Sequence, residues 1–180
     1  MENWKDIYLE LIDVINDKMP EIKWIDMWHE QVSYLTSELP FPTPAIFLSF
    51  NVLDITDESQ LVQDCDIQID FRLFYETFSD TYGGSYNQDS ALSFLEGVTK
   101  IHTTFHGTDG ESYGTLKRVA VKEEESGGAG NLYRVSFSTM IKDSSAQKEY
   151  NNTLVNDISI SNESIENIPL DVNTHTFIID

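Results

Sequence analysis

Residues 64–75, DCDIQIDFRLFY, alternate apolar and polar side chains almost without a break. Successive side chains of a strand point to opposite faces of its sheet, so a period of two predicts a strand with one buried face. The apolar side chains of this stretch are Cys65, Ile67, Ile69, Phe71, Leu73 and Tyr75. The polar side chains Asp66, Gln68, Asp70 and Arg72 fall on the other face. The chain is therefore expected to build a sheet that is covered on one side.

Two segments have the spacing of amphipathic helices. Apolar residues recur every three or four positions over 3–18 and again over 88–105. Pro20 ends the first helix because proline has no amide hydrogen for the next turn. His106 and Gly107 end the second, where glycine tolerates a left-handed turn. Asp89 is placed to cap the second helix near its start.

Four further segments are typical of strands. Residues 22–28 form a short one, and Ala45 to Phe50 form another directly after Pro40, Pro42 and Pro44. Residues 115–122 and 132–141 are expected to pair as a hairpin across the loop EEESGGAGN. Residues 53–60 are acidic and polar and are interpreted as a loop. The predicted fold class is α+β, with a mixed or antiparallel sheet of four or five strands and two helices packed mainly on one face.

The composition changes near Asp143. We divide the chain into an α+β core domain, residues 1–142, and an extended acidic and polar C-terminal arm, residues 143–180. The arm is too poor in apolar residues to form a core of its own, so it is either disordered or docked on another surface. Its short β-prone pieces favour docking onto an exposed sheet edge. The expected docking anchors are Ile158, Ile160, Ile168, Leu170, Phe177 and Ile178.

Charge limits the classes of partner. The chain has 31 acidic and 11 basic residues, a formal net charge of −20. Such a protein repels nucleic acid through most of its field, which argues against a DNA reader and suits a surface that DNA must slide past. Solubility alone is the alternative explanation. The sequence has no apolar run long enough to cross a bilayer and begins without the basic region of a secretory signal, so synthesis in the cytoplasm is expected.

The residues that could support chemistry do not form a known motif. His102 and His106 have the i, i+4 spacing of a zinc motif, but Thr103 stands where that motif needs Glu. Asp64, Asp66 and Asp70 are better explained as the polar face of a half-buried sheet than as a metal or acid–base site. The lone Cys65 is expected to be a buried, inert thiol. No cofactor, no metal and no enzymatic activity are predicted.

The order of the predicted elements resembles that of phage tail terminator and tail-completion proteins. The resemblance covers residues 3–143 and rests on the first helix, the strand PTPAIFLSF, the long strand before the glycine-containing loop, the 88–105 helix and the strand that ends in MIKDSSA. It implies a structural protein of the virion tail or neck that closes as a ring, usually a hexamer, between the tail tube and the head connector. Six copies would carry six times −20, or −120, around DNA that passes unbound.

Three alternatives use the same features. A DNA mimic would need its carboxylates along one face of a monomer or dimer. A carboxylate-based metal enzyme would bind a divalent ion, with Asp64, Asp66 and Asp70 as candidate ligands. An acidic protein-interaction domain of a bacterial host would need no viral role.

Overall fold

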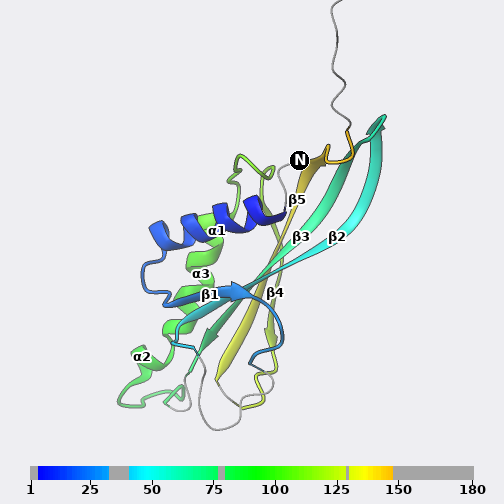
Figure 1. Cartoon of the computed structure of the whole chain (residues 1–180). Helices are drawn as coiled ribbons and strands as arrows, with labels where there is room; N and C mark the ends of the chain where they lie inside the picture. Colours follow the sequence, from blue (N-terminus) through cyan, green and yellow to red (C-terminus); the bar gives the residue numbers. More distant parts are fainter. Residues whose placement is uncertain (1–3, 33–40, 77–79, 129, 148–180) are drawn as a thin grey trace, which may run out of the picture. The chain divides into compact units, whose positions relative to one another are not determined.

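A five-stranded mixed sheet with helices on one face is the architecture of this chain (Figure 1). The computed structural model describes residues 4–32, 41–76, 80–128 and 130–147, which all belong to one compact unit. The elements are α1 (Trp4–Lys18), β1 (Trp24–Met27), β2 (Ala45–Ser59), β3 (Val62–Tyr75), α2 (Gln88–Ala91), α3 (Ser93–Phe105), β4 (Lys117–Glu124) and β5 (Asn131–Asp143). The predicted fold class is confirmed.

The strand order is β1-β2-β3-β5-β4, so β3 lies in the middle of the sheet. It pairs antiparallel with β2 on one side and with β5 on the other, over nearly its whole length. β4 pairs antiparallel with β5, as the hairpin prediction requires. β1 pairs parallel with β2, but only with Ala45–Leu48. The alternating strand of the sequence is thus the centre of the fold.

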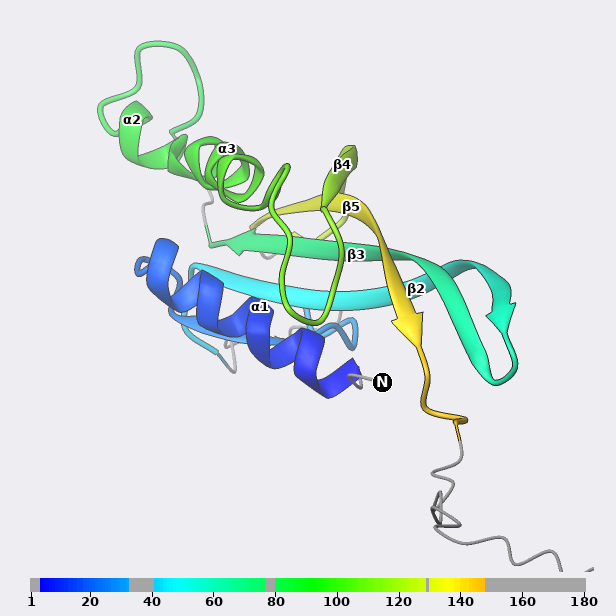
Figure 2. The same ribbon diagram turned by 90° about the horizontal axis from the view of Figure 1, so that it is seen from above.

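The main core lies between the sheet and the helices α1 and α3 (Figure 2). α1 contributes Ile7, Leu11 and Ile15, which are fully buried at the spacing that the sequence predicts. α3 contributes Ile101 and Phe105 from its inward face. These side chains pack on the apolar side of β3, which we call the first face of the sheet. At its centre the ring of Phe71 contacts those of Phe105, at a centroid distance of 4.5 Å, and Phe137, at 5.5 Å, and the latter two are 6.3 Å apart.

The opposite side, the second face, has a smaller apolar cluster at one end of the sheet. Phe47 and Phe74 are fully buried there and both pack edge-on against Phe41, at centroid distances of 5.0 and 6.0 Å. Trp28, in the segment that follows β1, packs against the same cluster. Beyond it the second face is polar, as the alternation of β3 predicts.

The prediction of a loop at 53–60 is wrong, because β2 continues as a strand to Ser59 and the chain turns at Gln60–Leu61. This half of β2 and its partner in β3 form a long ribbon that extends past the helices (Figure 1). The β2 residues of this ribbon are exposed, so the backbone ladder holds them without burial and polar side chains are tolerated. The acidic composition indicated exposure to solvent rather than the absence of a strand.

The predicted 88–105 helix is divided at Leu92 into α2 and α3. Asp89 is not a cap: Asn87 holds the N-cap position of α2, and no side-chain hydrogen bond caps that helix. The predicted apolar stripe of 88–105 includes Leu95 at helical spacing, but Leu95 is 44% exposed and the adjacent Phe94 is buried instead. The ring of Phe94 stacks on Tyr133 of β5 at 5.5 Å, which fixes the register of the buried stripe.

The predicted arm starts inside the sheet, because Asp143 still pairs with Gln63 of β3. The candidate anchors Ile158, Ile160, Ile168, Leu170, Phe177 and Ile178 all lie outside the described residues. Their docking role stays a prediction.

The aromatic packing at the centre of the sheet is testable by truncation. Phe71→Ala should lower the free energy of unfolding by about 3–5 kcal/mol, because it removes a fully buried ring and leaves a cavity. Leu95→Ala on the outer side of α3 should change it by about 0.5 kcal/mol or less. Urea denaturation followed by tryptophan fluorescence measures both. Equal effects of the two variants would contradict this assignment of the core.

Candidate functional site: a buried polar network and two unpaired strand edges

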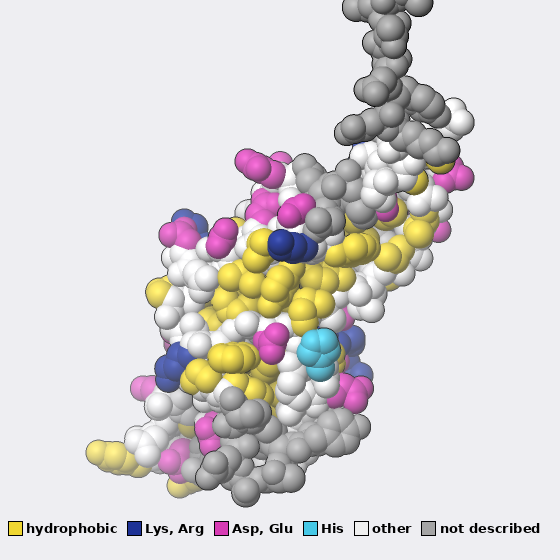
Figure 3. Space-filling view, viewed as in Figure 1, with side chains coloured by type: hydrophobic (Ala, Val, Ile, Leu, Met, Phe, Trp, Pro, Cys, Tyr) yellow, Lys and Arg dark blue, Asp and Glu magenta, His cyan; other side chains and the backbone are white. Residues whose placement is uncertain are grey.

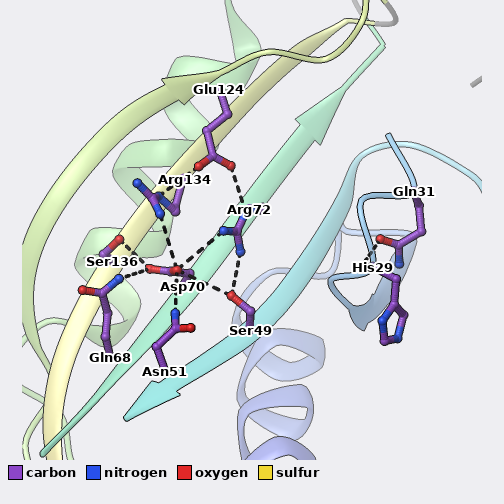
Figure 4. A network of polar contacts seen from close by, with 10 residues as sticks. All are labelled: His29, Gln31, Ser49, Asn51, Gln68, Asp70, Arg72, Glu124, Arg134 and Ser136. Atoms are coloured by element: carbon purple, nitrogen blue, oxygen red, sulfur yellow. Dashed lines mark hydrogen bonds and ion pairs between the residues drawn. The ribbon is translucent and has the colours of Figure 1, made fainter. Parts of the chain in front are cut away.

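The second face holds a buried carboxylate, Asp70 of β3, at the centre of a polar network (Figure 4). Its oxygens accept hydrogen bonds from Ser136 Oγ at 2.6 Å and Gln68 Nε2 at 2.8 Å. Weaker contacts come from Asn51 Nδ2 at 3.3 Å and Ser49 Oγ at 3.5 Å. Asp70 therefore lies on the predicted polar face of the sheet, but it is buried there. The side chain is 0% exposed and its acceptors are occupied by donors of β2, β3 and β5.

Two arginines connect Asp70 to a second carboxylate, Glu124 at the end of β4 (Figure 4). Arg72 lies 3.6 Å from Asp70 and 2.8 Å from Glu124. Arg134 lies 3.7 Å from Asp70 and 3.1 Å from Glu124. The guanidinium of Arg72 also covers the ring of Trp28 at 4.8 Å, a favourable cation–π geometry. Two cations and two anions cancel formally, so the network joins the strands without adding net charge to the interior.

The polar network is poorly suited to binding a metal ion. The structure does not bring Asp64, Asp66 and Asp70 together as a ligand set, because Asp66 is exposed and Asp70 is occupied by the arginines. Within the described ranges no group of three or more His, Cys, Asp or Glu side chains could hold a metal ion. Cys65 is buried as predicted, and burial, followed by the charges of Asp143, Asp64 and Asp66, raises the pKa of its thiol.

The histidine pair lies at the end of α3, beside β4. The rings of His102 and His106 are 4.8 Å apart, and burial lowers the pKa of His102, with smaller contributions from the charges of Arg118 and His106. His106 Nδ1 accepts a hydrogen bond of 3.1 Å from the backbone N–H of Arg118. His106 therefore has a structural role here: it covers the first part of the outer edge of β4.

Beyond that point the sheet has two edges without a strand partner among the described residues. β4 is the last strand on its side and pairs with β5 alone. On the other side β1 covers only Ala45–Leu48, which leaves the outer edge of β2 from Ser49 to Ser59 without a paired strand. Unpaired edges present rows of backbone donors and acceptors that can add a strand from another chain.

Both edges expose apolar side chains. On β2, Val52, Leu53 and Ile55 are 45%, 57% and 52% exposed, and on β4 Val119 and Val121 are 55% and 45% exposed. Figure 3 shows hydrophobic side chains spread across the middle of the molecule, from the region of α1 and β1 toward the far end of β2. Exposed apolar side chains along a strand edge are typical of a site that binds another protein chain.

The two edges differ in charge. The free half of β2 carries Asp54, Asp57 and Glu58, whereas β4 carries Lys117, Arg118 and Lys122. None of these three cations has a carboxylate partner within the part of the chain that the structure describes. The carboxylates at the end of β4 are used within the chain, since Glu124 binds the arginines and Glu123 hydrogen-bonds Tyr133. One edge is therefore acidic and the other basic.

Comparison of the chain with models of protein families and with curated proteins finds no match. No helix among the described residues is long and apolar enough to span a membrane. The sequence analysis missed both the network and the edges. The network joins residues that are up to 66 positions apart, Asp70 and Ser136 among them. The charge of each edge was visible in the sequence as KRVAVK and DITDES, but not its place at the border of the sheet.

The network predicts a strong effect from one atom change. Asp70→Asn should lower the free energy of unfolding by about 3 kcal/mol, because it leaves two largely buried arginines with one carboxylate. Asp66 is exposed and lies on the same face of β3, four residues before Asp70, so Asp66→Asn is the matched control. It should change the free energy of unfolding by about 0.5 kcal/mol or less. Chemical denaturation at neutral pH measures the difference, and similar values for the two variants would contradict the role of Asp70.

Proposed function

We propose that this chain is a structural protein of a phage virion, a tail terminator or tail-completion protein that forms a ring at the head–tail joint. The observation that carries the proposal is a single sheet whose two edges have no strand partner among the described residues and differ in charge, one acidic and one basic. Contacts between unlike surfaces are heterologous, and repeated heterologous contacts close into a ring when the rotation allows it. The resemblance in the order of the elements supports the same role.

The net charge fits a ring around DNA. With −20 per copy, a hexamer has six times −20, or −120, and DNA meets repulsion at every angle instead of binding. The tail tube and the head connector are the proposed partners, DNA is cargo that passes without being bound, and the virion neck is the proposed location. Such a role needs no catalytic centre and no cofactor.

A DNA mimic is the second candidate, and one observation favours it. Asp6, Glu10, Asp13 and Asp17 recur on α1 at helical spacing, a row of carboxylates such as a mimic would present. The carboxylate of Glu10 is used within the chain, because it accepts the backbone N–H groups of Glu111 and Ser112 at 2.8 and 3.0 Å. A mimic or an acidic interaction domain would not use two complementary edges.

Light scattering of the purified protein at low and moderate salt tests the proposal. We expect a species of about six times the mass of one chain, 20.6 kDa, that becomes more abundant as salt screens the repulsion between copies. Negative-stain images of that species should have a central hole. A monomer at both salt concentrations, even at high protein concentration, would contradict self-assembly and favour the mimic or the interaction domain.

A further inference from the structure

We propose that neighbouring copies join by adding β4 of one copy to the free half of β2 in the next, as an antiparallel pair. The occupant of each unpaired edge is thus a second copy of this chain. The inference rests on the proposed ring but goes further, since it assigns the two edges to each other, with their direction and register.

The direction follows from the topology. β2, β3, β5 and β4 alternate in direction, so β4 runs opposite to β2 within one copy. In a ring whose axis lies along the strands, rotation leaves the direction of every β2 unchanged. β4 of one copy therefore meets β2 of the next as an antiparallel neighbour, and the sheet continues from copy to copy.

The charges specify the same partner. Antiparallel pairing can place Lys122 opposite Asp54, and the same register sets Val121 opposite Ile55 on the first face. Lys122 pairs with Arg134 and Asp54 pairs with Asp66, so Lys122 and Asp54 both belong to the second face and meet there without a flip of either strand. Neither Lys122 nor Asp54 has an ion-pair partner among the described residues, so each can pair across the interface.

Length and apolar surface also fit. Beyond the part of its edge that His106 covers, β4 continues from Val119 to Glu124, and the strand of β2 that follows its pairing with β1 is long enough to match this stretch. The pairing would cover Val52 and Ile55 on one side and Val119 and Val121 on the other, which are among the exposed large apolar side chains. Cross-strand contacts of β-branched side chains stabilise such a pair.

Pairing of like edges is less favourable. Two β2 edges would bring Asp54, Asp57 and Glu58 of each copy together, and like charges across a strand pair are destabilising. Two antiparallel β4 edges could set Arg118 against Glu124, but Glu124 is already held by Arg72 and Arg134. A β4–β4 contact would also close as a dimer and leave β2 uncovered, so it cannot build a ring.

Engineered cysteines test the contact directly. In a Lys122→Cys, Asp54→Cys double variant, oxidation should give a covalent ladder of copies on a non-reducing gel. An internal disulfide is excluded, since β5 and β3 separate β4 from β2 in one copy by about three strand spacings, roughly 14 Å. Cys65 is buried and remains in place in all variants.

The single variants are the controls. Lys122→Cys alone and Asp54→Cys alone should stay monomeric on the same gel, while mixing the two should give a cross-linked dimer. A dimer from Lys122→Cys alone would assign β4 to β4, and one from Asp54→Cys alone would assign β2 to β2. Either result overturns the inference, as does a double variant that gives no ladder.

Charge exchange gives a second, independent readout. Lys122→Glu should raise the protein concentration at half-assembly by about tenfold or more, because it places a carboxylate opposite Asp54. Adding Asp54→Lys in the same chain should restore assembly and returns the net charge to its original value. Lys18→Glu, at an exposed position of α1, makes the same change in net charge away from both edges and should have a much smaller effect.

These outcomes separate the two proposals. If the wild type forms rings and neither the charge exchange nor the cysteines report the β4–β2 contact, the edge assignment is wrong and the ring stands. If the ladder forms but light scattering and images give open chains or dimers, the edge pairing stands and the terminator function is wrong.

Discussion

The structure depends on the two sides of β3. Its apolar side chains form the middle of the core under α1 and α3, and its polar side holds a buried carboxylate between two arginines. Because both edges of β3 are paired, a shift of one residue would move Asp70 under the helices and expose Phe71. Such a shift would place a carboxylate in the aromatic core and a phenylalanine in the ion network. The two features together therefore fix the register of β2 and β5.

That network also decides what the outer strand presents to solvent. Glu124 turns inward to Arg72 and Arg134, so two of the 11 basic residues and two carboxylates neutralise one another inside the molecule. The surplus of acidic residues is left on the surface. β4 differs from that surface, because its two lysines and its arginine have no carboxylate partner among the described residues. Because Glu124 pairs with arginines in the interior, β4 is left as a basic edge on an acidic protein.

Much of this could be predicted from the sequence. The alternation of 64–75 identified β3 and its buried face, and the spacing of Ile7, Leu11 and Ile15 identified α1, because one periodicity fits these segments and no other. The prediction failed where polarity was read as the absence of structure: β2 continues through Asp54 and Asp57 because backbone pairing, not burial, holds it. Burial of Asp70 could not be predicted either, since its partner Arg134 comes from a strand 64 positions later in the chain.

Exposed edges are a hazard for a β-sheet protein, and this chain has the devices that limit it. β4 has a register shift between Arg118 and Ala120, and both that strand and β2 carry charge along the free edge. The register shift and the charges disfavour pairing with an unrelated exposed strand. The opposite charges of the two edges still allow one pairing, because two like edges repel each other and an acidic edge attracts a basic one. The same side chains can therefore keep single copies in solution and select the neighbour when copies assemble, which is the combination that a self-assembling ring subunit needs.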